Sequence, residues 1–543
     1  MAQLLLVAVP LALLLLWRLV SSRCYVSRNP LDNIGGPRPP SFVLGNVPDF
    51  FARDNQEYLA NYLSTYGPVA TLYGFFGDKW LHVYDPKALH SIYVKDQDSY
   101  YRGHTTNIMN RMLLGPGLLA TTGGEHRKQR KLLNPAFSAV HMRGLAPVFY
   151  ATARKLKTAL ERSVRDGPRD LDVLGWMGRT ALELVGQGMM GYSFDPLVED
   201  VHNDFAEALK AFMPSLVAIQ WSRLFAATAD AIRPAWLRRV LLDLVPIASI
   251  QRMKALCDVI SERSRAIYDE KKGAVERGDE ETLLAMGEGK DMLSILLKEN
   301  MKAADEDRLP DSVLLAMLTT FMFAGADTTS NGLSRILHLL CEHRDVQDKL
   351  RAEIRAAIEQ YGEEIPYDEL SALPYLDAVC RETLRLYALA SFSLRDAKQD
   401  TVLPLSSPVR GLDGKMLTEI PITKGTTILA NIPACNTNKA VWGEDALEWR
   451  PERWLAPLPR SVEEAHVPGI YANLMTFLAG GHACIGFKFS QLEMKVVLCV
   501  LLSTFKFELS EKPFVWNFAA ISYPSTSYVS SKPEMPLKVG LAP

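Results

Sequence analysis

The residues best suited to chemistry in this chain surround one cysteine in the stretch FLAGGHACIGFKFSQLEMK, residues 477–495. Cys484 stands in a glycine-rich loop just before a segment that has helical character. A helix N-terminus offers free backbone N–H groups and the positive end of the helix dipole, and both favour a thiolate over a thiol. Cys484 is therefore a candidate thiolate; a buried, inert cysteine is the ordinary alternative.

A second candidate lies in FMFAGADTTS, residues 321–330, inside a long apolar helix that we expect to begin near Asp311. Gly, Asp and Thr lower helix propensity, so their succession here suggests a role other than packing. The Thr328 hydroxyl can donate a hydrogen bond to the carbonyl of Ala324 and open the helix locally. Gly325 would let a flat ligand approach the backbone. The alternative is a core helix with a harmless kink.

A third candidate is CRETLRLY, residues 380–387, where Glu382 and Arg385 share one helix face. Most such pairs are solvated salt bridges of little consequence. The later string EWRPERW, residues 448–454, supplies Arg453 for a bidentate second contact to the carboxylate. We therefore expect a buried Glu–Arg–Arg network.

In order, AGADTT, ETLR, PERW and FLAGGHACIG resemble the signature motifs of the cytochrome P-450 monooxygenases. The last string matches the family pattern F-x-x-G-x-x-x-C-x-G through Phe477, Gly480, Cys484 and Gly486. The resemblance covers nearly the whole chain. It implies a mainly α fold with a minor β part, the cytochrome P-450 fold, and haem b with Cys484 as the axial thiolate ligand of the iron. Phe477 would shield the sulfur, and the glycines would let the loop lie flat under the porphyrin.

The resemblance also implies roles for other residues. Asp327 and Thr328 match the pair that relays protons, and Glu382, Arg385 and Arg453 match the structural triad. The haem propionates would be held by His126, His482, Arg130 and Arg395. The two histidines stand where the family often has Trp and Arg, and they can still donate to a carboxylate.

The family's proline pair after the E-x-x-R helix is also absent, because Ala388 and Leu389 stand there. This leaves the shape of the wall at residues 390–393 open.

The reaction implied by the resemblance is insertion of one oxygen atom from O2 into a hydrophobic substrate with electrons from NADPH. The chain contains no flavin or dinucleotide loop, so we expect a separate partner, NADPH-cytochrome P-450 reductase, with cytochrome b5 as a second candidate. Basic residues that could receive an acidic partner are Arg127, Lys128, Arg130, Lys131 and Lys488. For Arg127, Lys128 and Lys131 the alternative is a solvated, charged helix face.

The elements that position these residues follow a membrane segment. Residues 4–17 carry no charge, and arginines follow this apolar run while none precedes it. We expect a single-pass anchor over residues 1–22, a proline-rich hinge over 23–40 and the catalytic domain over 41–543, on the cytosolic side of the endoplasmic reticulum. A cleaved signal peptide is the alternative, but it would need a basic region before the apolar run.

Composition supports one large, mainly helical body. The 543 residues carry a formal charge of −2, which gives no field for nucleic acid. Seven scattered cysteines without a C-x-x-C pair indicate a reducing compartment. The pattern predicts a strand over residues 78–86, a helix over 172–191 and an exposed loop or frayed helix over 270–291.

The substrate is the least defined part. Segments that line the pocket in the family are apolar here, at residues 107–120, 314–326 and 518–522, and no fixed charge is evident to grip a carboxylate. Residues 211–236 are apolar enough to dip into a bilayer. By analogy with fungal relatives we expect a terpenoid of secondary metabolism. The alternatives are a fatty-acid or xenobiotic hydroxylase and, of a different class, a reductase-independent haem-thiolate isomerase or a haem sensor.

Overall fold

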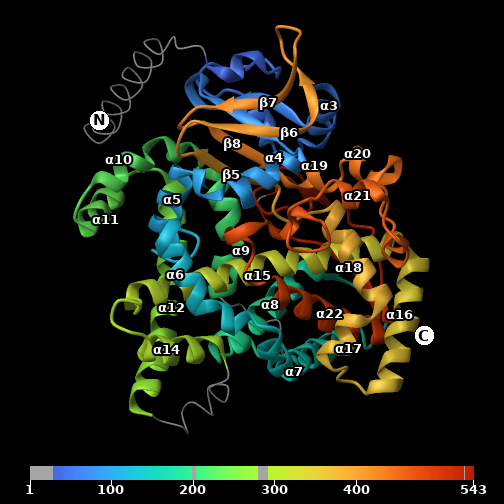
Figure 1. Cartoon of the computed structure of the whole chain (residues 1–543). Coiled ribbons are helices and arrows are strands. Elements are labelled where there is room, and N and C mark those ends of the chain that lie inside the picture. The colour runs from blue at the N-terminus through green and yellow to red at the C-terminus, as the bar shows by residue number, and fades with distance from the viewer. Residues whose placement is uncertain (1–28, 198–203, 279–290, 531) are drawn as a thin grey trace.

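The computed structural model describes residues 29–197, 204–278, 291–530 and 532–543. Helices form most of the body and short strands gather into small sheets, as predicted (Figure 1). The longer helices are α3 (Gln56–Tyr66), α5 (His104–Leu114), α6 (Gly123–Leu133), α7 (Ala139–Ser163), α8 (Val173–Val185), α9 (Asp204–Ala218), α11 (Ala235–Asp243), α12 (Ala248–Arg277), α14 (Met292–Lys302), α15 (Asp311–Glu342), α16 (Arg344–Tyr361), α18 (Pro374–Leu386) and α22 (Phe487–Thr504).

Shorter elements connect these helices. The short helices are α2 (Val47–Phe50), α4 (Pro86–His90), α10 (Ala226–Ala231), α17 (Tyr367–Ala372), α19 (Ile432–Asn436), α20 (Lys439–Trp442) and α21 (Arg460–Glu464). The strands are β1 (Val69–Tyr73), β2 (Lys79–Val83), β3 (Tyr100–Arg102), β4 (Arg169–Asp172), β5 (Phe392–Ala397), β6 (Thr401–Arg410), β7 (Met416–Ile422), β8 (Thr427–Asn431), β9 (Phe505–Leu509), β10 (Val515–Asn517), β11 (Tyr523–Ser525) and β12 (Pro536–Leu541). The predicted strand over 78–86 corresponds to β2, and the predicted helix over 172–191 to α8 and the π-helical turn η6 (Gly186–Met190).

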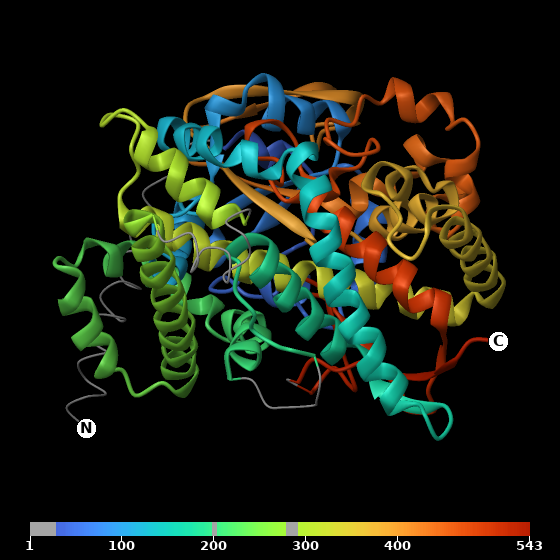
Figure 2. The same ribbon diagram turned by 90° about the horizontal axis from the view of Figure 1, so that it is seen from below.

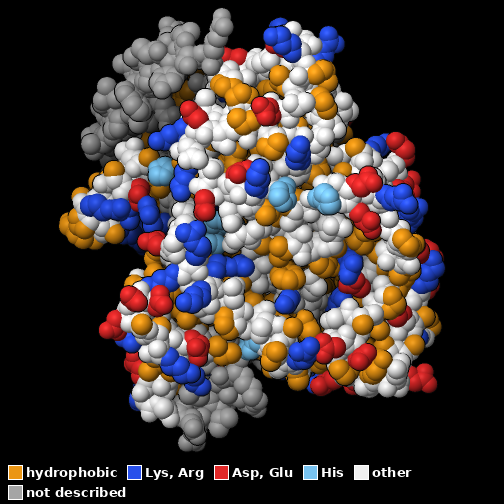
Figure 3. Space-filling view, in the orientation of Figure 1, with side chains coloured by type: hydrophobic (Ala, Val, Ile, Leu, Met, Phe, Trp, Pro, Cys, Tyr) orange, Lys and Arg blue, Asp and Glu red, His pale blue; other side chains and the backbone are white. Residues whose placement is uncertain are grey.

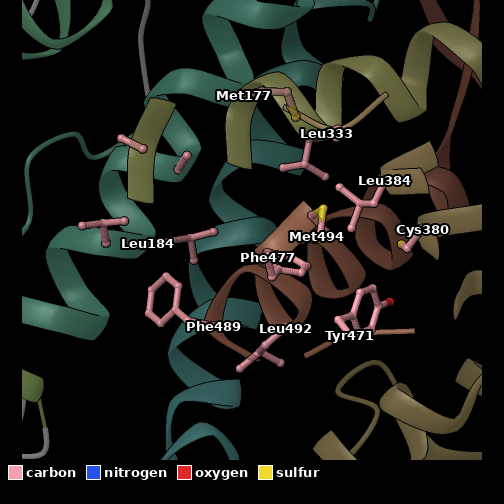
Figure 4. Packing of buried hydrophobic residues seen from close by; sticks show 14 of the residues in the cluster. Met177, Leu184, Leu333, Cys380, Leu384, Tyr471, Phe477, Phe489, Leu492 and Met494 are labelled. Atoms are coloured by element: carbon pink, nitrogen blue, oxygen red, sulfur yellow. The ribbon is translucent and has the colours of Figure 1, made fainter. Parts of the chain in front are cut away.

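The long helix α15 begins at Asp311, as expected, and crosses the middle of the body (Figures 1 and 2). It packs against α8, α12, α18 and α22, and α7 lies along α22. Side chains from four of these helices meet in the core, where Met177, Leu333, Leu384 and Met494 lie together (Figure 4). Full burial of each such side chain stabilises the fold by about 1.5–3 kcal/mol. This core fixes α15 and α22, which carry the candidate catalytic residues.

A five-stranded sheet with the order β1-β2-β8-β5-β3 lies at one end of the body (Figure 1). Strands β2 and β8 are parallel, and the other neighbours are antiparallel. In the β3–β5 pair Arg102 lies opposite Arg395. The sheet therefore places two arginines at the same level of its edge.

The predicted anchor, residues 1–22, lies outside the described residues. Part of the proline-rich segment packs on the body, because Leu31 is buried and its carbonyl accepts a hydrogen bond from Thr71 Oγ1 at 3.0 Å. The division of the chain at residues 22 and 40 remains a prediction. Within the described ranges, the helix long and apolar enough to cross a membrane is α15, which is a core helix of this body.

The charged stretch 270–291 differs from the expectation at both ends. Helix α12 continues to Arg277, and the side chains of Lys271 and Asp291 are fully buried with 2.8 Å between Nζ and Oδ2. A buried ion pair needs its partner because a lone buried charge is costly. The ends of the stretch are thus part of the core, and residues 279–290 between them lie outside the described residues.

Candidate active site

The cysteine loop folds back on itself directly before α22. The backbone N–H of Cys484 donates to the carbonyl of Phe477 at 2.8 Å, and Gly486 is the N-cap of α22. The Phe477 ring is buried and packs edge-on against Tyr471. The sequence prediction that Cys484 lies where a helix begins is confirmed.

Gly480 is required for a reason that the sequence did not give. Its φ is +61°, and a Cβ here would lie 1.8 Å from the carbonyl oxygen of Tyr93 in η3 (Ser91–Lys95). An L side chain rarely adopts this φ, and no side chain fits the space. The glycine thus lets the cysteine loop pack directly on the backbone of η3. Gly486 is less constrained, since a Cβ there would lie 3.7 Å from Phe137.

The Cys484 thiol lies deep in the protein and yet is accessible to solvent. Burial raises its pKa, while a backbone hydrogen bond from Gly486 and the charge of Arg130 lower it. The net direction is upward, so the helix N-terminus alone does not make Cys484 a thiolate. A coordinated metal ion would do so, because a metal-bound thiol is deprotonated. A deep but accessible sulfur is what a ligand-binding cavity requires.

Cationic and histidine side chains gather beside this loop. The rings of His126 and His482 lie 4.0 Å apart between centroids, at an interplanar angle of 34°. Burial and the nearby charges of Arg102, Arg130 and Arg395 lower the pKa of His126 to about 4 and hold the pKa of His482 even lower. Both histidines are therefore neutral at pH 7.

These side chains lack an anion. Among the described residues no carboxylate forms an ion pair with Arg102, Arg130 or Arg395, and Nδ1 of His482 and Nη2 of Arg395 are buried without a hydrogen-bond partner. Buried donors and unpaired cations are costly unless a ligand satisfies them. Two carboxylates, such as the propionates of haem, would satisfy this set, so the residues fit the expected cofactor.

Arg102 was missed by sequence reasoning. It donates from Nη1 to the carbonyl of Leu119 at 2.6 Å and faces Arg395 across the β3–β5 pair. Burial and the charge of Arg395 lower its pKa to about 10. No motif marks this residue, since only the strand register brings it to the site. Arg130 donates from Nη1 to the carbonyl of Ala483 at 2.8 Å, beside the cysteine.

The polar notch in α15 forms as predicted. The hydroxyl of Thr328 donates to the carbonyl of Ala324 at 2.7 Å. Asp327 is half-buried in α15, and desolvation raises its pKa to about 7. A cavity of about 20 Å³ touches Asp327, Asn331 and Lys210, and it has room for one water molecule.

Gly325 serves α8 rather than a flat ligand, which corrects our interpretation. A Cβ at Gly325 would lie 2.6 Å from Cγ2 of Val185. The glycine therefore allows α8 and α15 to approach closely, and this contact holds the helix that carries Asp327 and Thr328.

The Glu–Arg–Arg network is buried behind the cysteine loop. Arg385 makes the bidentate contact with Glu382, with Nε to Oε2 and Nη2 to Oε1 both at 2.8 Å. Arg453 contributes one contact, from Nε to Oε1 at 3.3 Å, and its Nη1 binds Asp445 at 3.0 Å. The expected bidentate role of Arg453 was thus wrong. Trp454, which the sequence analysis missed, donates to Glu382 Oε2 at 2.9 Å.

This network is connected to the cysteine loop through Asn436. Arg385 Nη1 donates to the carbonyl of Asn436 at 3.3 Å, and the amide oxygen of Asn436 accepts from the N–H of Met475 at 2.7 Å. Met475 opens the turn η10 (Met475–Phe477), which leads into the loop. The network therefore supports the loop through a short chain of hydrogen bonds.

The wall that lacks the proline pair is held by strand-like pairing instead. Ser391 Oγ donates to the carbonyl of Ala519 at 2.9 Å, and Ala390 forms an isolated bridge with Ile521. The N–H of Ser522 donates to the carbonyl of Leu389 at 3.1 Å. Two of the three segments that we expected to line the substrate pocket are thereby placed. Residues 518–522 lie on this wall, and residues 314–326 lie within α15.

The basic residues of α6 are partly paired with acidic neighbours. Arg127 lies 3.3 Å from Asp98, and Lys131 lies 3.8 Å from Asp307. All four side chains are exposed, so these ion pairs are weak and open to exchange. The exposed basic face of α6 could therefore still bind an acidic partner protein.

Comparison with known proteins gives one consistent family. The family model described as cytochrome P-450 matches residues 35–520. Cytochrome P-450 monooxygenase 91 of Postia placenta is 52% identical over 527 residues, which cover 97% of each chain. A protein named ganoderic acid synthetase from Ganoderma lucidum is 49% identical, over 99% of this chain and 98% of its own. A crystal structure titled as a cytochrome P-450 aligns with a TM-score of 0.69 and 22% identity, over 95% of this chain and 100% of that chain, which shows the fold.

Proposed function

The chain belongs to the cytochrome P-450 family, and on this basis we propose that it oxidises a terpenoid of fungal secondary metabolism with electrons from a separate reductase. Members of the family are monooxygenases that carry thiolate-ligated haem, receive electrons from NADPH through a reductase and act on hydrophobic substrates. The terpenoid class is favoured by the relative whose name is ganoderic acid synthetase. The observation that carries the proposal is the deep, accessible thiol of Cys484 beside a set of unpaired cations.

In this proposal Cys484 would supply the thiolate that holds the haem iron, and the haem, when bound, would supply the activation of O2. Phe477 packs under the loop with a buried ring, and its carbonyl accepts the hydrogen bond from the N–H of Cys484 at 2.8 Å. Glu382, Arg385 and Arg453 act as structural support, because they lie behind the loop and reach it through Asn436. A preorganised, water-poor setting strengthens electrostatic interactions at the reacting atoms.

His126, His482, Arg130 and Arg395 would bind the two propionates, together with Arg102. Neutral imidazoles donate one hydrogen bond each, and the guanidinium groups supply the compensating charge. The close contact between His126 and His482 suggests that the two rings are oriented as a pair.

Asp327 and Thr328 would deliver protons to the site. The raised pKa of Asp327, about 7, lets its carboxyl exist in either protonation state near neutral pH, which suits a proton carrier. The small cavity between Asp327 and Lys210 suggests one water molecule as the source. The oxygen of Thr328 can accept a proton while its own hydrogen bond is directed to Ala324.

We further propose anchoring to the endoplasmic reticulum membrane by residues 1–22. Exposed apolar side chains on and beside α11 support contact with a bilayer, since Trp236, Val240 and Leu244 are 66%, 48% and 58% exposed. Figure 3 shows hydrophobic side chains next to Lys and Arg side chains over α10 and α11. Such a mixture suits the interface between lipid tails and headgroups.

The proposal is tested by reconstituting the purified protein with reductase and NADPH and analysing products from terpenes and fatty acids. We expect NADPH-dependent oxygenated terpenoids, and their loss in Cys484→Ala. Conversion of fatty acids alone would favour the alternative hydroxylase. A product formed from peroxides without reductase would indicate the isomerase, and no product with an intact haem-thiolate spectrum would indicate a sensor.

A further inference from the structure

A half-buried arginine at the junction of α5 and the 3₁₀ turn η7 (Gln220–Phe225) has no anionic partner among the described residues. Arg223 donates from Nη2 to the hydroxyl of Thr106 in α5 at 2.9 Å, and its other hydrogen bond goes to the amide oxygen of Gln220 at 3.4 Å. Neither acceptor carries a charge. In the described part of the chain no carboxylate lies within ion-pair distance of this guanidinium.

The surroundings of Arg223 explain why it stays unpaired. Burial lowers its pKa, and the carboxylate that most offsets this effect, Asp396, is engaged elsewhere. One oxygen of Asp396 accepts from the N–H of His104 at 2.7 Å, and the other accepts from Thr427 at 2.9 Å. The N-terminal residues 1–28 contain no Asp or Glu, so that segment brings no counter-ion. Even partial loss of solvent around a guanidinium is costly, and an anionic ligand at the side chain would offset that cost.

The carboxylate of Asp230 is also taken, because three other arginines already pair with it. Arg111, Arg233 and Arg238 all lie within 3.7 Å of one carboxylate, that of Asp230. In the part of this region that the structure describes, arginine side chains thus outnumber carboxylates. It adjoins the exposed apolar side chains of α11, where an amphipathic molecule could enter from a membrane (Figure 3).

Helix α5 connects this arginine to the centre of the site. Thr106 lies in its first turn, and at its other end a Cβ on Gly115 would be 2.8 Å from the side chain of Ala316 in α15. Thr106 and Gly115 are nine positions apart along the helix, which corresponds to roughly 13 Å. An anion held at Arg223 would thus be remote from the helix that carries Asp327 and Thr328.

We propose that Arg223 binds the carboxylate of an amphipathic hydrophobic acid and so directs oxidation to a carbon far from that carboxylate. The proposal rests on the proposed function and narrows its substrate to terpenoid or fatty acids. It departs from the sequence analysis, which found no charge suited to a carboxylate. Arginine is well suited because its planar guanidinium can bind a carboxylate with two parallel hydrogen bonds.

The test compares acids with their methyl esters on the full chain in vesicles of phosphatidylcholine, which has no net charge. Equilibrium dialysis measures the affinity for hexadecanoic acid, oleanolic acid and their esters, and does not depend on the haem spectrum. We expect each acid to bind about tenfold to a hundredfold more tightly than its ester. Arg223→Gln should abolish this ratio without changing the ester affinity, and Arg223→Lys should keep part of it.

Arg238→Gln is the matched control, because Arg238 lies nearby but is paired with Asp230; its acid-to-ester ratio should equal that of the unchanged protein. An acid-to-ester ratio of one in the unchanged protein for both pairs would overturn the proposal. An acid-to-ester affinity ratio that persists in Arg223→Gln would also overturn it. So would an equal loss of affinity for acid and ester in this variant, because that would show a purely structural role for Arg223. If Arg223→Gln alters only binding to vesicles with phosphatidylglycerol, the anion is a lipid headgroup and the proposal is also wrong. A missing haem-thiolate spectrum would contradict the proposed function, while the dialysis ratio would still decide the role of Arg223.

Discussion

Replacing Glu382 by Gln should destabilise the protein severely although the two side chains have nearly the same shape. Glu382 accepts five hydrogen bonds, two from Arg385 and one each from Arg453, Trp454 and the backbone N–H of Arg450. The side chains of Glu382 and Arg385 are both fully buried. The glutamine amide can keep some of these contacts, but it carries no charge to balance the guanidinium.

The size of the effect follows from which cation loses its partner. Arg453 keeps Asp445 at 3.0 Å, whereas Arg385 keeps only carbonyl acceptors, among them Ala446 at 2.6 Å. Breaking a buried ion pair by removing one partner costs about 3–5 kcal/mol. Because domains are stable by only about 5–15 kcal/mol, we expect a large fall in the urea midpoint. Unfolding of the haem-loaded protein in urea, followed by circular dichroism, measures it.

The matched control is Asp368→Asn, which removes a bidentate partner of an arginine at the surface. Arg143 binds Asp368 with contacts of 2.8 and 3.0 Å, and both side chains are about half exposed. Solvent screens this pair, so the control should unfold near the midpoint of the unchanged protein. If Glu382→Gln unfolded there as well, the charge of Glu382 would be unimportant and our reasoning about the network would be refuted.

Three further predictions follow from the site. Gly325→Ala should lower the free energy of unfolding by about 1–3 kcal/mol, because the added Cβ would collide with Val185. In a double-mutant cycle of unfolding free energies, Val185→Ala should remove most of this penalty, because its smaller side chain leaves room for the added Cβ. Gly480→Ala should abolish haem incorporation, measured as haem per protein, because its Cβ would collide with the carbonyl of Tyr93 at a positive φ. The pKa of Asp327 is about 7 in the folded protein and 3.8 in the unfolded chain, so the folded state holds this proton more tightly. The contribution of Asp327 to the free energy of unfolding is therefore full below pH 3.8 and is lost as the pH rises to about 7. Asp327→Asn should remove this decline in unfolding free energies measured across the pH range; an identical decline in both proteins would contradict the assignment.

Local spacing was enough to predict the contacts made within one helix. Thr328 lies four residues after Ala324, and Glu382 lies three before Arg385, so helix geometry alone brings each pair together. The position of Cys484 before α22 was also readable, because glycines and an apolar run mark the start of a helix.

Contacts that depend on tertiary packing could not be read in this way. Val185 meets Gly325 only because α8 packs on α15, and Arg102 reaches the site only through the register of β3 with β5. Arg223 belongs to no sequence motif. It stands out only because the acidic groups near it, Asp396 and Asp230, bind other partners. The sequence shows which charges exist, whereas only the fold shows which of them remain unpaired.

The hydrogen bonds between the Glu–Arg–Arg network and the cysteine loop explain why motifs about a hundred residues apart act as one unit. Arg385 holds the carbonyl of Asn436, whose side chain in turn fixes Met475 at the start of the turn before Cys484. Thr476 adds a second connection, because its hydroxyl donates to the carbonyl of Leu384 at 2.7 Å, in the same helix as Arg385. The loop that carries the sulfur is thus fixed from α18 at two points, Asn436 and Thr476. A change at Glu382 should therefore disturb thiolate coordination as well as stability, since both depend on the same bonds.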